Sequence, residues 1–482
     1  MYRGIPSLKW ISGFGLDRLS GEAVESDGVS LARQRKRYSK KDDDSTSLPA
    51  DIFTEARDLP TLFMNGSTAP VFAKSSLQGQ QDLASNAIRL PSDALIGKQW
   101  YLYGPSQGVE YGANVIDAWA ASVLIARKRA SGVSFPWHRA ASLPPLVGPL
   151  DIVGDVGEGA GRGAGELQLA AAPIEFKEVL RAAPGLTVAI ADSGCATNED
   201  LVRKLAWSGG CPKKAKTDGF GRCLGYDYGN ESPDPTQSTE SHGTQTAGLI
   251  AAESDNHWGI AATCPNCKLI CIKIFNDETR TLSTTAIVRA LEHIAKSGAK
   301  VSNHSYGGFG DDRLERYAFE RLLGKGDHLA FVAAGNAGCN IDCRGKKNCA
   351  GKRCPNTQLW TPASYNLPGL ISIASNTKKG SVSMFSNVGP SSVQIFTPGS
   401  EIVSIDKRGS PTGTVGSGTS FASPIAAGIA AFVWSVIPEA TAAQVQNAIL
   451  TTARHNPQFE GLSRVPGILD AYNVLVKLAN LV

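Results

Sequence analysis

Short apolar runs alternate with helical periods from about residue 99 onward. Five runs are nearly continuous in apolar residues and predict strands buried on both faces, at 186–191, 269–275, 300–306, 328–335 and 370–375. Helical periods predict helices over 242–252, 283–297, 311–323, 420–437 and 441–453. This alternation favours an α/β fold, doubly wound, with a mainly parallel sheet flanked by helices.

Two stretches depart from this pattern. Residues 1–98 look loosely structured, and a basic run followed by an acidic run at 32–47 indicates an exposed segment. That segment is either a solvated linker or a processing site at the exposed pair Lys36-Arg37. Residues 120–180 are rich in Ala, Gly and Pro without a clear period, which is unusual inside a compact domain. We therefore expect an N-terminal pro-region or disordered segment over 1–98. A main domain over 99–482 would carry an unusual insertion at about 120–180.

Composition and charge narrow the class of protein. The chain is 42% hydrophobic and 19% charged, as in globular proteins, and its net charge of +4 is too small to indicate nucleic acid or a membrane surface. The longest apolar stretch, 425–437, is too short to span a bilayer. No secretory apolar segment is visible near Met1. We expect no nucleic-acid partner and no transmembrane segment.

The ten cysteines all lie between Cys195 and Cys354. An even, clustered set favours disulfides and an oxidising compartment. The competing interpretation is a zinc site, for which the candidate ligands are Cys339, Cys343, Cys349 and Cys354. The Cys-x-x-Cys spacing that zinc sites favour occurs at Cys264 and Cys267 alone, which weakens this alternative.

Three polar positions at strand ends or helix starts carry the candidate chemistry. Asp192 ends an apolar strand, where a buried carboxylate is costly unless it is paired; otherwise it caps the next turn. His242 precedes a helix of small residues, a place where a single histidine more often packs or caps. The stretch GTVGSGTSFASP at 413–424 offers Ser417, Ser420 and Ser423 at a helix start. Such a position suits either a capping residue or a nucleophile, because the helix dipole favours developing negative charge.

Together these positions supply a nucleophile, a base and an orienting acid. A serine hydroxyl needs a histidine to take its proton, and the histidine needs a carboxylate to hold its tautomer. The order along the chain is Asp, His, Ser. A lipase or esterase would instead need G-x-S-x-G and the order Ser, Asp, His.

Three sequence blocks carry a resemblance to a known family. DSG at 192, HGTQTAG at 242 and GTSFASP at 418 resemble the signature blocks of the subtilisin-like serine proteases. NHSYGG at 303, VAAGNAG at 332, TPASY at 361, FSNVGP at 385, TPGSEIVS at 397 and PGILDAYN at 466 follow in the family's order. The resemblance covers roughly residues 99–119 and 181–480.

The resemblance implies a serine endopeptidase that cleaves proteins or peptides through an acyl-enzyme. It assigns Ser420 as nucleophile, His242 as general base, Asp192 as orienting acid and Asn336 as oxyanion donor, and leaves Ser417 and Ser423 structural. The alternative is a catalytically inactive binding protein on the same scaffold. Because all four catalytic positions are filled, the sequence gives that alternative little support.

The resemblance also implies how substrate binds. A peptide would add as a strand along Ser305, Tyr306 and Gly307, with a second flanking strand near 277–282. This chain has DETRTL where the family often has glycines, which implies a narrower and more polar S4 side. Trp360 falls near the floor of the S1 pocket and would limit the P1 residue, which precedes the scissile bond, to small or medium side chains.

Family members usually bind structural calcium, and two segments resemble their calcium-binding elements. Asp200 resembles a calcium-ligand carboxylate, and the loop at 253–259 would add Asp255 or Asn256. Asp200 lies one residue closer to Asp192, and the loop is one residue longer, than the family pattern has. The alternative is an acidic surface loop that binds nothing, because calcium needs several converging oxygens.

The family further implies a precursor, or zymogen, whose own pro-region acts as inhibitor. It implies a secreted or secretory-vesicle location, in which Asn65 and Asn230 are candidate glycosylation acceptors. Asn303 also fits the acceptor pattern, but it falls on the expected substrate strand and would be inaccessible.

Overall fold

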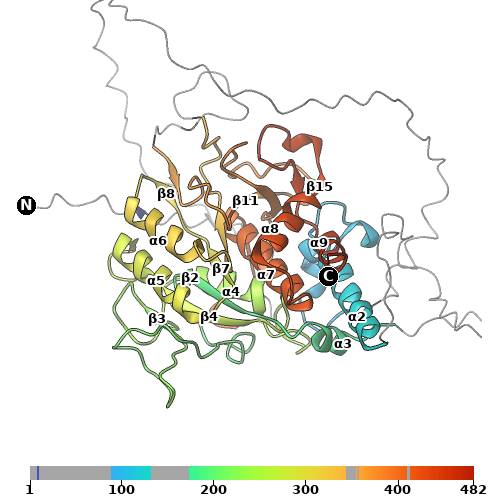
Figure 1. Cartoon of the computed structure of the whole chain (residues 1–482), viewed down its shortest axis with the longest axis horizontal. Helices are drawn as coiled ribbons and strands as arrows, with labels where there is room; N and C mark the ends of the chain where they lie inside the picture. The colour runs from blue at the N-terminus through green and yellow to red at the C-terminus, as the bar shows by residue number, and fades with distance from the viewer. Residues whose placement is uncertain are drawn as a thin grey trace, which may run out of the picture. The chain divides into compact units, whose positions relative to one another are not determined.

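A nine-stranded sheet forms the centre of the described structure, a computed structural model that covers residues 8–9, 88–131, 173–343, 354, 358–409 and 413–481 (Figure 1). All of its elements belong to one unit, residues 1–15 and 77–482. The strand order is β15-β16-β12-β11-β9-β7-β2-β4-β3, and every described pair is parallel except β15 with β16. The strands are β2 (Thr187–Asp192), β3 (Gly225–Asp227), β4 (Lys268–Lys273), β7 (Val301–His304), β9 (Leu329–Ala333), β11 (Leu370–Asn376), β12 (Ile395–Pro398), β15 (Arg454–His455) and β16 (Gly467–Ile468).

Helices cover both faces of this sheet. Strand β2 shows the division, because Val188 and Ile190 face one core while Ala189 and Ala191 face the other. The first core holds α2, α4, α7, α8 and α9, and the second holds α5 and α6. The helices are α2 (Val115–Ser131), α3 (Phe176–Ala182), α4 (His242–Ala251), α5 (Thr284–Ser297), α6 (Arg313–Leu323), α7 (Thr419–Val436), α8 (Ala442–Thr451) and α9 (Ala471–Ala479). The expected doubly wound α/β fold is confirmed.

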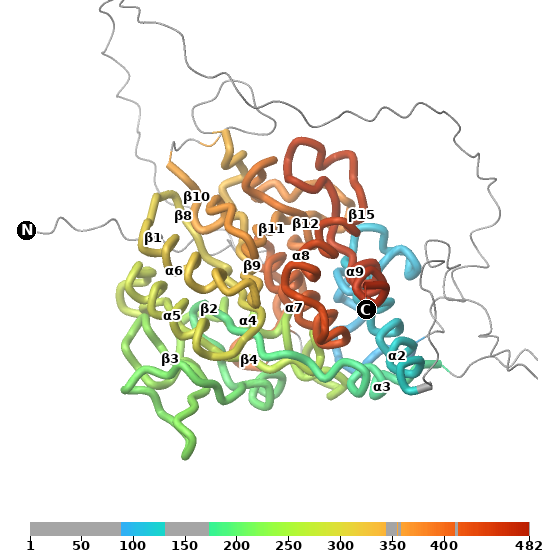
Figure 2. The backbone as a smooth tube through the Cα atoms, in the orientation of Figure 1, coloured from blue at the N-terminus to red at the C-terminus, as the bar shows by residue number. Residues whose placement is uncertain are grey.

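Three smaller sheets accompany the central one among the described residues. They are β1 (Leu8–Lys9) with β6 (Thr281–Leu282) and β5 (Phe275–Asn276), β8 (Gly308–Phe309) with β10 (Trp360–Thr361), and β13 (Ile402–Ser404) with β14 (Thr414–Gly416). Figure 2 shows β8 and β10 side by side. Leu282 of β6 and Trp360 of β10 line a cavity at the candidate site.

Helix α7 is buried along its whole length. It packs on β7, β9, β11 and β12 from one side and on α4 from the other. Among the described residues it is the one helix long and apolar enough to cross a membrane, and all of that stretch lies inside the protein core. Its apolar composition is therefore accounted for by the central place it occupies.

The expectation that residues 120–180 lack a helical period is wrong at both ends of that range. The Ala-rich stretch continues α2 to residue 131, and α3 follows at 176–182. Alanine has the highest helix propensity, and α2 also buries Trp119 edge-on against Phe176. Residues 132–172 lie outside the described residues, as do the pair Lys36-Arg37 and the acceptor Asn65.

The expected disulfides are present. Cys195 pairs with Cys271, Cys211 with Cys223, Cys264 with Cys267 and Cys339 with Cys354, and Cys343 is also disulfide-bonded. The zinc alternative is therefore wrong for the described cysteines, because sulfurs in disulfides are not thiolate ligands. Cys211, Cys223 and His293 do bring three donor atoms within 4.8 Å of one another, but two of those atoms form a disulfide. Cys349 lies outside the described residues.

Candidate active site

The candidate site lies at the carboxyl edge of the central strands. β9, β7 and β2 are neighbours and parallel, so the segments that follow them emerge at one edge of the sheet. Asp192 ends β2, Ser305 follows β7 and Asn336 follows β9. Helices α4 and α7 begin at the same edge with His242 and Thr419. The fold thus gathers residues that are far apart in sequence.

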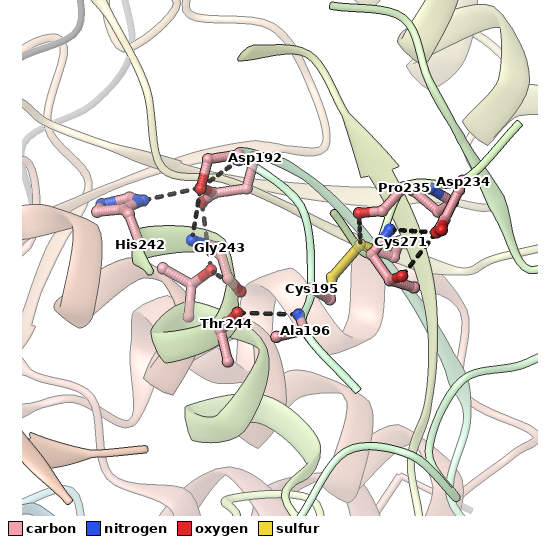
Figure 3. Close-up of a disulfide and its surroundings, with 12 residues drawn as sticks. Asp192, Cys195, Ala196, Asp234, Pro235, His242, Gly243, Thr244 and Cys271 are labelled. Carbon is pink, nitrogen blue, oxygen red and sulfur yellow. Dashed lines mark hydrogen bonds and ion pairs between the residues drawn. A yellow bond between two sulfur atoms is a disulfide. The ribbon is translucent and has the colours of Figure 1, made fainter. Parts of the chain in front are cut away.

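Asp192 and His242 form a buried pair. His242 Nδ1 donates to Asp192 Oδ1 at 2.8 Å (Figure 3). The same oxygen accepts the backbone N–H of Ser193 at 2.6 Å, and Oδ2 accepts the hydroxyl of Thr246 at 3.2 Å. These donors satisfy a carboxylate that would otherwise be costly to bury. With Nδ1 donating, Nε2 of a neutral imidazole is the nitrogen left to accept a proton.

The first turn of α4 is tied to the segment that follows Asp192. The Gly243 backbone N–H donates to the Ser193 hydroxyl at 3.0 Å, and Thr244 Oγ1 accepts the Ala196 N–H at 2.9 Å. Between these contacts, the Cys195 disulfide joins the segment to β4 (Figure 3). The imidazole and its carboxylate partner are therefore held by the backbone around both of them.

Ser420 lies in the first turn of α7, and its side chain reaches a cavity. It is 7% exposed, and its hydroxyl donates to the Ser305 carbonyl at 3.3 Å. The ring of the next residue, Phe421, meets the His242 ring edge-on with centroids 6.4 Å apart. The hydroxyl thus lies at the positive end of a buried helix whose first turn contacts the imidazole through Phe421.

The two neighbouring serines make structural contacts. Ser417 Oγ accepts the Glu401 N–H at 2.8 Å. Ser423 Oγ donates to Asn303 Oδ1 at 2.7 Å, and both side chains are fully buried. Asn303 is thus inaccessible, as its place on the substrate strand led us to expect. Of the three serines in the motif, Ser420 is the one that lines the cavity.

A proline in α7 links the helix to the expected substrate strand. Pro424 has no N–H to donate to the carbonyl of Ser420, four residues earlier. That carbonyl instead accepts the Ser305 hydroxyl at 3.0 Å. Ser305 also accepts from the Asn303 amide at 2.9 Å, so β7 and the first turn of α7 share one network.

Asn336 is fixed by its side-chain oxygen. Oδ1 accepts both the backbone N–H and the hydroxyl of Thr419, each at 2.9 Å. This turns the amide nitrogen toward the start of α7, where a Cβ on Gly418 would lie 3.3 Å from Nδ2. Asn387 holds the same loop, since it donates to the Ala334 carbonyl and accepts the Ala337 N–H. Asn387 belongs to the FSNVGP block, whose sequence alone indicates no role for this residue.

One cavity brings the expected substrate residues together with the chemistry. Ser305, Tyr306, Gly307 and Trp360 line it with Asn336 and Ser420, and its volume is about 20 Å³, room for about one water. The remaining lining residues are Leu282, Ala333, Gly335 and Thr419. Leu282 belongs to β6, so the second flanking strand expected near 277–282 also reaches the cavity.

The candidate calcium residues lie elsewhere, around the loop that follows α4. Asn256 donates to Asp200 Oδ1 at 2.9 Å. The Asp255 carboxylate instead accepts the Ser92 N–H, whereas its backbone N–H donates to Asp93 at 2.9 Å. Burial, with the charge of Asp200 nearby, raises the pKa of Asp93 to about 7.

Asp93 is the acidic neighbour that the sequence analysis missed. It lies within residues 1–98, read there as loosely structured, yet its side chain is buried beside Asp200. The signal that could have found it is an isolated Asp next to the apolar residues that begin the main domain. The structure therefore pairs two buried carboxylates, Asp93 and Asp200.

Comparison with known proteins decides the family. The model of the Subtilase family matches residues 183–468, more than half of the chain. The chain belongs to the subtilase family.

Known relatives agree with this assignment. The subtilase is 31% identical to thermitase of Thermoactinomyces vulgaris over 273 residues, which are 56% of this chain and 81% of thermitase. It is 32% identical to subtilisin DY of Bacillus licheniformis over 44% of this chain and 70% of that protein. An extracellular protease of Xanthomonas campestris is 30% identical over 57% of this chain and 48% of its own length.

A solved structure shows the shared fold. The solved structure of proteases from Pseudoalteromonas arctica PAMC 21717 matches 81% of the subtilase over 100% of the length of the solved chain. The TM-score is 0.51 and the sequence identity is 19%. The family match and the relatives named above make the subtilase a serine endopeptidase, a hydrolase of peptide bonds in proteins, as the resemblance implied.

A buried carboxyl lies behind the cavity wall of the subtilase. Glu315, on α6, accepts the Tyr365 hydroxyl at 2.6 Å and is fully buried near Tyr306. Burial raises the pKa of its carboxyl to about 7, from an ordinary value of 4.5. Between pH 4.5 and 7, this carboxyl is therefore mostly protonated in the folded protein and mostly ionised in the unfolded chain.

Glu315→Gln is expected to remove a pH dependence of stability. Between pH 4.5 and 7 the native state holds more protons than the unfolded state, so the free energy of unfolding falls as pH rises. Between pH 4.5 and pH 8, the free energy of unfolding of the variant should therefore rise by about 3 kcal/mol relative to that of the native chain. Urea unfolding at both pH values, in a Ser420→Ala background to prevent autolysis, measures this gain. Parallel pH profiles for the two proteins would contradict the expectation.

Proposed function

We propose that Ser420 is the nucleophile of this subtilase, with His242 as general base and Asp192 as the acid that orients it. The observation that carries the proposal is the 2.8 Å bond between His242 Nδ1 and the buried Asp192. It lies beside the helix start that presents Ser420 to the cavity. No observation on the described residues favours the inactive alternative, and the Asp192–His242 bond supports the active one.

The proposed reaction follows from these contacts. His242 Nε2 takes the Ser420 proton as Oγ attacks the peptide carbonyl carbon, and Asp192 stabilises the imidazolium that forms. The Asn336 amide and the backbone N–H of Ser420 donate to the oxyanion. Collapse of this intermediate breaks the C–N bond, and His242 gives its proton to the leaving amine. Water then hydrolyses the acyl-enzyme by the same proton route.

The substrate is proposed to bind as an added strand between two edges. One edge is the segment Ser305–Gly307, and the other is β6, which contributes Leu282 to the same cavity. Trp360 occupies much of the space at the cavity floor, which supports a limit to small or medium P1 side chains.

Fluorophosphonate labelling tests the nucleophile. The purified chain should form a covalent adduct at Ser420, because the reagent needs an activated hydroxyl. Ser420→Ala should abolish labelling, while Ser417→Ala, which removes only the contact to Glu401, should retain it. Labelling that survives Ser420→Ala would refute the assignment.

The same assay tests the oxyanion donor. Asn336→Leu removes the amide while leaving Ser420 and His242 in place, so the adduct should still form, about 10²–10³ times more slowly. Peptide hydrolysis should show this loss in kcat with little change in KM. An Asn336→Leu protein that labels at the native rate would remove Asn336 from the mechanism.

Residues 1–98 are proposed to act as an inhibitory pro-region of a catalytic domain over 99–482. β1 supports this, because Leu8 and Lys9 pair antiparallel with Leu282 and Thr281 of β6, the proposed substrate edge. β1 also contacts β8, so it lies in the place proposed for substrate. A synthetic peptide of residues 1–15 should inhibit protein from which residues 1–87 have been removed. Hydrolysis unaffected by saturating peptide would contradict this role.

Calcium is proposed to bind between Asp93 and Asp200, with Asn256 contributing its side-chain oxygen. The fit rests on two buried carboxylates that lie close together. The charged groups that act most on Asp200 are also acidic; they are Glu253 and Glu199. A hard divalent cation would neutralise this cluster with the oxygen ligands it prefers. Asp255 does not share in this set, because its carboxylate is turned to Ser92.

Calcium removal is expected to destabilise the protein. At a free calcium concentration about 100 times Kd, binding adds about 3 kcal/mol to the free energy of unfolding, and EGTA should remove it. Asp93→Asn and Asp200→Asn should lose this difference, whereas the exposed control Asp311→Asn should keep it. Thermal unfolding of Ser420→Ala protein with calcium or EGTA measures the effect. Identical unfolding in both conditions would exclude the site.

The protein is proposed to be secreted. Its disulfides support an oxidising compartment, and one similar protein is named an extracellular protease. Cell fractionation with an antibody to the folded domain tests this proposal. Recovery of the mature chain in the reducing cytosol alone would contradict it.

A further inference from the structure

A two-stranded hairpin carries one of the proposed substrate edges, and its turn carries a carboxylate. β5 and β6 pair antiparallel, so residues 277–280 form the turn between them. Asp277 is the first residue of this turn, and it is partly buried. Its two carboxylate oxygens bond to different parts of the fold.

One oxygen of Asp277 holds the segment that leads into α4. Oδ1 accepts the backbone N–H of Thr239 at 2.9 Å and the Thr239 hydroxyl at 2.7 Å. Thr239 lies three residues before His242, with which α4 begins. The carboxylate therefore joins the hairpin of the substrate edge to the chain that carries the proposed general base.

The other contacts of this segment are exposed. Glu240 forms an ion pair with Arg280, whose side chain is 63% exposed, and the Thr239 carbonyl accepts from the exposed Lys407 at 2.8 Å. Solvent and salt weaken such contacts between exposed groups. The bonds to Asp277 are therefore the firmer connection between the two segments.

The second oxygen of Asp277 is fixed by a buried lysine. Lys273 is 1% exposed, and its ammonium bonds to Asp277 Oδ2, to Asp227 Oδ2 at 2.9 Å and to Asn230 Oδ1 at 3.1 Å. An ammonium has three N–H donors, so these three acceptors satisfy it. A buried cation that is fully bonded holds its acceptors in place, because releasing one of them would leave a donor unpaired.

Lys273 is in turn packed against the chain around Asp192. The two residues end the neighbouring parallel strands β4 and β2 and lie opposite each other in the register. A Cβ on Gly194, just after Asp192, would lie 3.3 Å from Lys273 Cδ. The lysine therefore fixes the Asp277 carboxylate relative to the strand end that carries the partner of His242.

We propose that Asp277 is a positioning residue that sets the spacing between His242 and the substrate edge β6. Lys273 fixes the carboxylate, and the carboxylate fixes Thr239, so a peptide that pairs with β6 is aligned with the imidazole through one side chain. Asp277 acts through Thr239 and not on the reacting atoms. This role rests on the proposed function, in which His242 is the general base and β6 is a substrate edge.

Kinetics of Asp277→Ala on two substrates test this role. An extended peptide that pairs with β6 should lose about tenfold in kcat with little change in KM, because small misplacements of bound reactants slow the chemical step. A minimal ester that does not reach β6 should lose less, because Asp192 still holds the imidazole. The ratio of kcat/KM between the extended peptide and the ester should therefore fall.

Asp234→Ala is the matched control. Asp234 accepts the backbone N–H of Thr236 at 2.9 Å and the Thr236 hydroxyl at 2.6 Å, which is the same pair of bonds within one exposed loop. Its loss should leave the ratio unchanged. Thr239→Ser keeps both donors to Asp277 and should retain the native ratio. Thr239→Val lacks the hydroxyl and should give a ratio between those of the native protein and Asp277→Ala.

Two results overturn the proposal. One is an Asp277→Ala protein with native-like circular dichroism that keeps the native ratio. The other is a Thr239→Val protein that keeps it. The second variant decides the question even if Asp277→Ala does not fold, because it leaves the carboxylate bonded to Lys273.

Hydrogen exchange separates this proposal from the reaction mechanism. The extended peptide is added to Ser420→Ala protein, where no turnover occurs, and exchange of the Thr239 amide is measured. The peptide should slow this exchange, and the effect should disappear when Asp277→Ala is added. That outcome supports the connection even if fluorophosphonate labelling refutes Ser420. Exchange that does not respond to the peptide, in protein whose native form labels at Ser420, refutes the connection and leaves the mechanism standing.

Discussion

The first turn of α7 is bound to the end of β7 by side-chain hydrogen bonds, and the site depends on this junction. Ser423 donates to Asn303, and Ser305 donates to the Ser420 carbonyl that Pro424 leaves open. A helix buried along its whole length thereby fixes both the hydroxyl and the strand edge against which a peptide would lie. These bonds tie Ser420 to the end of β7, so a small shift of α7 would carry both together.

Two further histidines, His304 and His328, lie buried near the site. His304 and His328 share the Ser302 hydroxyl, and burial lowers the pKa of His304 to about 3 and of His328 to about 4. Both therefore stay neutral at neutral pH. They complete hydrogen bonds to Ser302, and the carboxylate partner of His242 distinguishes it from them.

Sequence reasoning located the central strands and helices to within a few residues, because buried parallel strands and amphipathic helices leave strong periodic signals. It failed at α2, where an Ala-rich run was read as irregular, since alanine carries little hydrophobic contrast between helix faces. Asp192, His242, Asn336 and Ser420 were found through ordered motifs, and the structure brings Asp192 to His242 and Asn336 to the start of α7. Asp93 was missed because its place beside Asp200 results from the tertiary fold, which brings two distant parts of the chain together.

The packing of α2 against α9 has a consequence for the order of events during synthesis. These helices come from opposite ends of the described chain and lie side by side (Figure 2). The face of α2 that α9 covers has no partner until residues 471–479 have left the ribosome. Asp192 and His242 emerge early, whereas α7 and its covering helix come late. The hydrophobic face of α2 is therefore covered only after α4 and α7 have both been synthesised.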